Sequence, residues 1–116
     1  MKLISREELK DKLDRGDDFT LVMTLEKWAF QLKHIPGSIN IFPTEVTNGI
    51  LDPNDEIVVY CAAPACPASI IAYQRLKAGG YENVRRYPGG IADWDDAGYS
   101  AEGEFAVTKK RELVAA

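Results

Sequence analysis

The sequence is poor in the residues that build metal sites, disulfide frameworks and nucleic-acid surfaces. It holds two cysteines and one histidine in 116 residues, whereas a closed zinc site usually takes four ligands. Acidic residues outnumber basic ones by 18 to 14, which gives a net charge of −4, and no stripe of basic residues interleaved with aromatics offsets this balance. We therefore expect no metal, no other cofactor and no nucleic-acid partner.

Long apolar segments are also missing. No apolar run approaches the roughly 20 residues that cross a bilayer, and the charged start of the chain, residues 1–10, lacks the apolar core of a signal peptide. We expect no membrane partner and a cytoplasmic location, where cysteines are more often free or catalytic than bridged. The length suits one domain, residues 1–116, with a single core.

What the sequence does contain is an alternation of apolar strands and amphipathic helices. Strands are predicted at residues 19–23, 39–41, 57–60 and 83–87. Helices are predicted at residues 5–16, 25–32, 67–78 and 91–98, with one further turn within 44–51. The alternation favours a parallel sheet covered on both faces. The second helix should turn Trp28, Ala29 and Leu32 inward, and residues 100–116 should form a terminal helix or a loose tail.

The central segment joins an uninterrupted apolar strand to a helix through a loop that carries a thiol. Residues 57–60 show no alternation of apolar and polar side chains, which is typical of a strand buried on both faces. Cys61 follows directly, and the next helix begins near Pro67. Ligands of open α/β sheets bind beyond the carboxyl ends of the strands, and a helix amino end presents free N–H groups. A thiolate or an anion would be stabilised there.

Several separated motifs resemble the rhodanese-like domains. In chain order they are HIPGSINI, IVVYC, a loop and helix ending in GGY, and VRRYPGGIADWDDAGY. The resemblance runs over residues 5–99 and implies a three-layer α/β/α fold with a central, mostly parallel sheet. It further implies a sulfurtransferase whose loop cysteine accepts a sulfane sulfur as a persulfide and passes it to a nucleophile. Cys61 occupies that position.

The sequence departs from the family pattern at three points. Met23 and Leu25 stand where members often have an Asp and an Arg, so a structural charge pair is missing. The loop holds no charged side chain, although many members place an arginine there to meet an anionic donor. It is also longer than the commonest form and carries a second cysteine, which resembles a CxxxxC variant. After Cys61 the loop reads Ala62, Ala63, Pro64, Ala65, Cys66, Pro67, Ala68 and Ser69.

The uncharged loop limits what could ionise its thiol. A free cysteine has a pKa near ~8.5, so a reactive Cys61 needs something that lowers it. Backbone N–H groups of the loop and the amino end of the next helix are the groups available. Such a neutral cradle suits a singly charged persulfide better than doubly charged thiosulfate. We therefore expect polysulfide or glutathione persulfide ahead of thiosulfate as the sulfur donor, and a thiol as acceptor.

Cys66 and two arginines are secondary candidates. Cys66 could resolve a persulfide on Cys61 and leave a disulfide within the loop, could itself be the attacking thiol, or could be a packing residue. Arg85 or Arg86 could attract an anionic donor, although such a pair is more often a solvated strand end. His34 belongs to the turn motif, and we expect its ring to bond to backbone rather than to act in catalysis.

Three functions of different classes are therefore open. The first is the sulfurtransferase. The second is a non-catalytic rhodanese-like module that binds a protein partner, which the missing charges permit. The third is a dithiol redox protein that uses Cys61 and Cys66. Phosphatase and arsenate reductase chemistry is rejected, because a doubly charged oxyanion needs a loop arginine and the sixth position beyond Cys61 is Pro67. A homodimer is left open.

Overall fold

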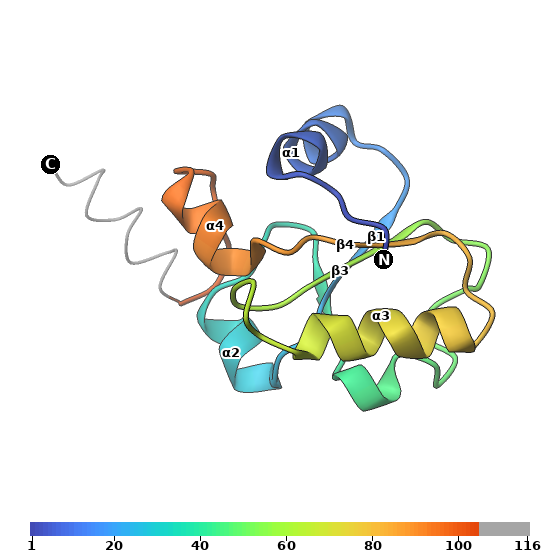
Figure 1. The fold of residues 1–116 in the computed structure, drawn as a ribbon. Helices are drawn as coiled ribbons and strands as arrows, with labels where there is room; N and C mark the ends of the chain where they lie inside the picture. The colour runs from blue at the N-terminus through green and yellow to red at the C-terminus, as the bar shows by residue number, and fades with distance from the viewer. Residues whose placement is uncertain (105–116) are drawn as a thin grey trace, which may run out of the picture.

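The computed structural model describes residues 1–104, and its centre is a parallel sheet (Figure 1). Within these residues the sheet has four strands in the order β2-β1-β3-β4, and each neighbouring pair is parallel. The strands are β1 Thr20–Met23, β2 Ile39–Asn40, β3 Ile57–Tyr60 and β4 Val84–Arg86. The predicted α/β class is confirmed, with the uninterrupted apolar strand β3 in the interior of the sheet.

Helices cover both faces of this sheet. They are α1 Arg6–Arg15, α2 Lys27–Leu32, the 3-10 turn η1 Pro43–Glu45, α3 Ala68–Ala78 and α4 Gly90–Asp96. In Figure 1, α1 and α4 lie on one side of the sheet, and α3 with η1 lies on the other. In the described part of the chain, none of these helices is long and apolar enough to cross a membrane. The predicted terminal helix or tail falls mostly outside the described residues.

Each face of the sheet buries its own apolar cluster, because successive side chains of a strand point to opposite faces. Val59 packs in the cluster that includes Leu76 of α3. Tyr60, the next residue, packs in the other cluster with Trp94 of α4. Since Cys61 continues the alternation, its side chain falls on the side of α3.

Hydrogen bonds define both ends of α1. The Ser5 side chain accepts a hydrogen bond from the Glu8 N–H at 3.1 Å, which satisfies one of the free N–H groups of the first turn. Gly16 ends the helix in the left-handed conformation, and its N–H bonds to the carbonyls of Leu13 and Lys12. Such an end favours glycine, which adopts a positive φ without steric cost.

The prediction for the inner face of α2 was wrong for Trp28. Its side chain is 64% exposed, and no residue of the helix is fully buried. Phe30 packs against the apolar core instead. Residues two positions apart lie on nearly opposite sides of a helix. Because Phe30 faces the core, Trp28 faces solvent.

A buried hydrogen-bond network at Tyr60 holds the carboxyl end of β3. The Ile35 N–H donates to the Tyr60 hydroxyl at 2.9 Å, and Ser38 Oγ lies 2.9 Å from the same oxygen. Ser38 uses its own hydrogen for the Ile35 carbonyl at 2.6 Å, so Tyr60 donates to Ser38. On the backbone side, the N–H and hydroxyl of Thr24 both donate to the Tyr60 carbonyl. These bonds fix the point where the cysteine loop begins.

The amino end of α4 packs directly on the first two residues of the loop. The N–H groups of Ile91 and Ala92 donate to the carbonyls of Cys61 and Ala62, each at 3.0 Å. Gly90 makes this approach feasible. It has a φ of +67°, and a Cβ at this position would lie 2.5 Å from the Cys61 carbonyl oxygen.

Gly90→Ala should therefore destabilise the protein more than Gly98→Ala. Gly98 also has a positive φ, of +78°, but no atom within 4 Å of an added Cβ, so its replacement should cost about 1–2 kcal/mol for the backbone conformation alone. The Gly90 variant carries that cost and must also displace the loop backbone. Urea unfolding of both variants measures the difference, and equal losses would contradict the close packing.

Candidate active site

The loop between β3 and α3 turns back on itself. The Cys66 N–H donates to the Ala63 carbonyl at 3.0 Å, which closes a turn with Pro64 and Ala65 at its centre. Proline suits the second position of such a turn because its φ is already fixed near the required value. The turn brings Cys66 back to Cys61, whose Sγ lies 3.4 Å from the Cys66 carbonyl oxygen.

Cys61 lies beneath this loop. Its side chain and backbone together are 1% exposed, and its Sγ lies 3.2 Å from Ser69 Oγ at the start of α3. Burial raises the pKa of the Cys61 thiol; the Ser69 hydroxyl and N–H oppose this shift, and the Cys66 side chain adds to it. This differs from the lowering that sequence reasoning expected. In this geometry burial favours the protonated form of Cys61.

Cys66 is the more exposed and the more acidic of the two thiols. It is half-buried, and burial alone would raise its pKa. The pKa is nevertheless lowered, because the Cys61 side chain and the backbone N–H groups of Ala68 and Ala62 hydrogen-bond to the sulfur and the charge of Arg86 attracts the thiolate. The cradle of backbone amides predicted for the loop is therefore present, but it surrounds Cys66.

Arg86 reaches the loop from β4. It is only 7% exposed, its Nε donates to Ser69 Oγ at 2.8 Å, and its Nη2 donates to the Pro64 carbonyl at 3.1 Å. A guanidinium group can only donate, so Ser69 Oγ accepts from Arg86 and its own hydrogen is left for the Cys61 sulfur. The loop without charged residues thus receives a positive charge from a neighbouring strand.

The other polar candidates lie away from the loop. Arg85 points to the opposite face of the sheet and pairs with Glu8 at 2.7 Å and Glu56 at 3.3 Å. His34 Nδ1 lies 2.7 Å from the Phe30 carbonyl oxygen and its ring stacks on Phe30, so its bond to backbone is as predicted. Within residues 1–104, no group of three or more His, Cys, Asp or Glu side chains is placed to hold a metal ion.

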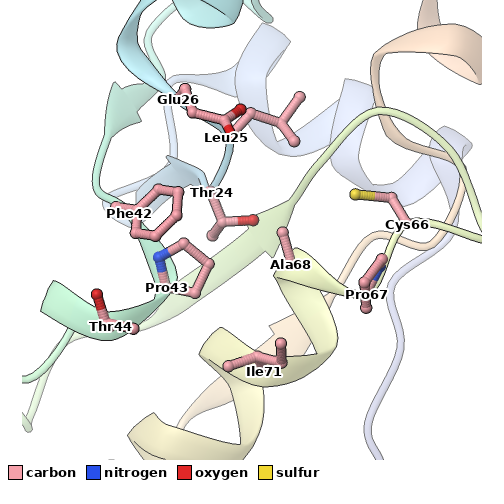
Figure 2. Close-up of a pocket in the computed structure, with 10 residues that line it drawn as sticks. All are labelled: Thr24, Leu25, Glu26, Phe42, Pro43, Thr44, Cys66, Pro67, Ala68 and Ile71. Carbon is pink, nitrogen blue, oxygen red and sulfur yellow. The ribbon is translucent and has the colours of Figure 1, made fainter.

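A pocket of about 280 Å³ opens beside the loop (Figure 2). Its lining residues are Thr24, Leu25, Glu26, Phe42, Pro43, Thr44, Cys66, Pro67, Ala68 and Ile71. Cys66 thus contributes to the pocket wall, and Cys61 does not. Sequence reasoning missed the wall formed by Phe42 and Pro43. The signal was available, since these residues follow β2 and the carboxyl ends of parallel strands meet at one edge of a sheet.

Comparison with known proteins gives one family and several relatives. A family model described as the rhodanese-like domain matches residues 5–97. The chain is 33% identical over 97 residues to the HTH-type transcriptional regulator Rv0324 of Mycobacterium tuberculosis, which covers 82% of this chain and 42% of that protein. It is 30% identical over 93 residues to the putative sulfur carrier protein YrkF of Bacillus subtilis, covering 78% and 49%. The chain spans about half the length of these relatives, or less.

Solved structures share the fold. The BH2092 protein from Bacillus halodurans superposes with a TM-score of 0.82 at 25% identity, over 90% of this chain and 78% of that one. The human single-domain sulfurtransferase TSTD1 superposes with a TM-score of 0.69 over 83% and 96% of the two chains. Its identity is 22%, so that likeness concerns the fold alone.

Arg86→Gln should make Cys66 less acidic. Removing the cation takes away one of the interactions that stabilise the thiolate, so the pKa of Cys66 should rise and its alkylation at neutral pH should slow by about threefold. The measurement is the rate of iodoacetamide reaction against pH, made in a Cys61→Ser background so that only Cys66 reacts. Arg85→Gln is the matched control, since it removes the same charge from the opposite face. Identical pH profiles for the two variants would contradict the assignment.

Proposed function

The chain belongs to the rhodanese-like domain family, and from this premise we propose that it is a sulfurtransferase that accepts a sulfane sulfur on Cys61 as a persulfide and passes it to a thiol. The observation that carries the proposal is the chain of contacts from Arg86 through Ser69 to Cys61. It aims the Ser69 hydroxyl at the Cys61 sulfur from 3.2 Å. A sulfur anion at this position has a hydrogen-bond donor already in place.

The transfer consists of two thiol exchanges. A thiolate attacks the outer sulfur of the donor, the S–S bond of the donor breaks, and its electron pair leaves with the donor's inner sulfur. An acceptor thiolate then attacks the outer sulfur of the Cys61 persulfide, and Cys61 leaves with the electron pair. One S–S bond breaks for each that forms, so no oxidant or reductant is consumed.

The pocket favours a polysulfide or an organic persulfide over thiosulfate as the donor. Its walls include Leu25, Phe42 and Ile71, and its one charged lining residue among those described is the acidic Glu26. A doubly charged oxyanion would meet a carboxylate there instead of a cation. Glutathione persulfide, which has a larger organic part, gains contacts with the apolar wall.

The name of one relative supports sulfur transfer in general terms. YrkF, which is 30% identical over 93 residues, is described as a putative sulfur carrier protein. The chemistry needs free thiols, and both Cys61 and Cys66 are free in the structure. A reducing compartment such as the cytoplasm keeps thiols in this state, and we place the reaction there.

Incubation with inorganic polysulfide should add one sulfur atom to the protein, and a thiol acceptor should remove it again. Intact-mass spectrometry measures both steps, and fragmentation of the loop peptide should locate the stable added sulfur on Cys61. The same concentration of thiosulfate should load the protein more slowly, because its oxyanion group would meet the carboxylate of Glu26 in the pocket. The Cys61→Ser/Cys66→Ser double variant is the control and should gain nothing. If the wild-type protein also gains nothing, the sulfurtransferase proposal fails and the non-catalytic binding module and the dithiol redox protein are left.

A dithiol redox protein is the second candidate, because the loop folds back and places the Cys61 sulfur 3.4 Å from the Cys66 carbonyl oxygen, with both thiols free. Such a protein works through a Cys61–Cys66 disulfide, so Cys66→Ser should abolish its activity. A sulfurtransferase with Cys61 as the carrier should still take up and release sulfur in this variant. A dithiol-reductase assay and a sulfur-transfer assay on the Cys66→Ser protein therefore separate the two functions.

A further inference from the structure

The two thiols of the loop differ in access to the pocket. Cys66 lines it, whereas Cys61 is 1% exposed and is not part of its wall. Figure 2 shows the Cys66 sulfur on the pocket side of the loop, with Phe42 and Pro43 across the space from it. A donor in this pocket would present its outer sulfur to Cys66, because the loop covers Cys61.

The two thiols also differ in their tendency to be protonated. The N–H groups of Ala62 and Ala68 and the charge of Arg86 favour a thiolate at Cys66. Cys61 accepts from the Ser69 hydroxyl, but its Sγ also lies 3.4 Å from the Cys66 carbonyl oxygen and 4.0 Å from the Ala63 carbonyl oxygen, which can only accept. These two acceptors favour the protonated form of Cys61, and Cys66 is the more reactive nucleophile.

We propose that Cys66 is the first acceptor of the sulfane sulfur, taking it from a donor bound in the pocket, and that the sulfur then moves within the loop to Cys61. This inference rests on the proposed sulfurtransferase function and adds a step to it. Cys66 becomes a catalytic residue that touches the substrate, and the pocket of Phe42, Pro43 and Ile71 becomes the binding site of a small persulfide or polysulfide.

Both steps balance without a further reactant. In the first, the Cys66 thiolate attacks the outer sulfur of a donor R–S–SH, the donor S–S bond breaks, and RS⁻ leaves, which gives Cys66–S–SH. In the second, the Cys61 sulfur attacks the outer sulfur of Cys66–S–SH and the bond to Cys66 breaks. The electron pair of that bond stays on Cys66, which takes the proton that Cys61 gives up. The products are Cys61–S–SH and the Cys66 thiol.

The difference in acidity sets the direction of the second step. In thiol exchange the more acidic thiol is the better leaving group and the less acidic one the stronger nucleophile. Cys66 lines the pocket and is the more acidic thiol, whereas Cys61 is covered by the loop and is the less acidic one, which favours the passage of sulfur from Cys66 to Cys61. There the product lies under the loop, close to the Ser69 hydroxyl.

Timed intact-mass spectrometry with inorganic polysulfide tests the relay on three proteins. Cys61→Ser should still gain one sulfur, and peptide fragmentation should locate it on Cys66. Cys66→Ser should gain its sulfur on Cys61 about tenfold more slowly than wild type, because the remaining thiol is buried and protonated. In the wild-type protein, peptide fragmentation should find the added sulfur on Cys66 at early times and on Cys61 later.

A second variant guards against a folding artefact. Cys66→Ala should load as slowly as Cys66→Ser, and thermal unfolding midpoints close to that of the wild type show that both variants are folded. Iodoacetamide labelling of the fully unfolded protein then reports whether Cys61 is a free thiol in each sample.

The outcomes separate the relay from the function on which it rests. If folded Cys66→Ser and Cys66→Ala both load Cys61 at the wild-type rate, or if Cys61→Ser gains no sulfur, the relay is wrong and the Cys61 sulfurtransferase stands. If no protein, including wild type, gains sulfur, the sulfurtransferase proposal fails and the relay fails with it.

Discussion

Arg86 can only donate hydrogen bonds, and this constraint sets which groups of the loop donate and which accept. The guanidinium is almost completely buried, so its donors must find acceptors, and it finds them in Ser69 Oγ and the Pro64 carbonyl. The two contacts tie the middle of the loop and the start of α3 to β4. They also leave the Ser69 hydrogen for Cys61 and place a positive charge near Cys66.

Much of the fold was predictable from sequence because its signals are local. The capping residues of α1, the uninterrupted apolar run of β3 and the glycines after α3 each act within a few positions. The role of Arg86 depends on strand register instead. It pairs with Val59, two residues before Cys61, and this alignment puts it on the same face as the thiol while Arg85 takes the other. A single sequence does not give the alignment of two strands.

The assignment of the two thiols could not be predicted for a different reason. The small residues of the loop correctly indicated a cradle of backbone amides, but which sulfur sits in it depends on the direction of each peptide plane. The N–H groups of Ala62 and Ala68, on either side of the turn closed by the Cys66 N–H and the Ala63 carbonyl, hydrogen-bond to the Cys66 sulfur. The Cys66 carbonyl oxygen instead lies 3.4 Å from the Cys61 sulfur. The spacing of residues in the sequence does not determine the directions of these peptide planes.

The helix α4, remote in sequence, contributes to the acidity of Cys66 through one peptide group. The Ile91 N–H holds the Cys61 carbonyl at 3.0 Å. In a trans peptide the N–H of the next residue points the opposite way, so Ala62 N–H is turned from α4 into the loop, where it bonds the Cys66 sulfur. Gly90 is what lets α4 come close enough to hold that carbonyl. The Pro-Gly-Gly motif thus acts on a thiol that it does not touch.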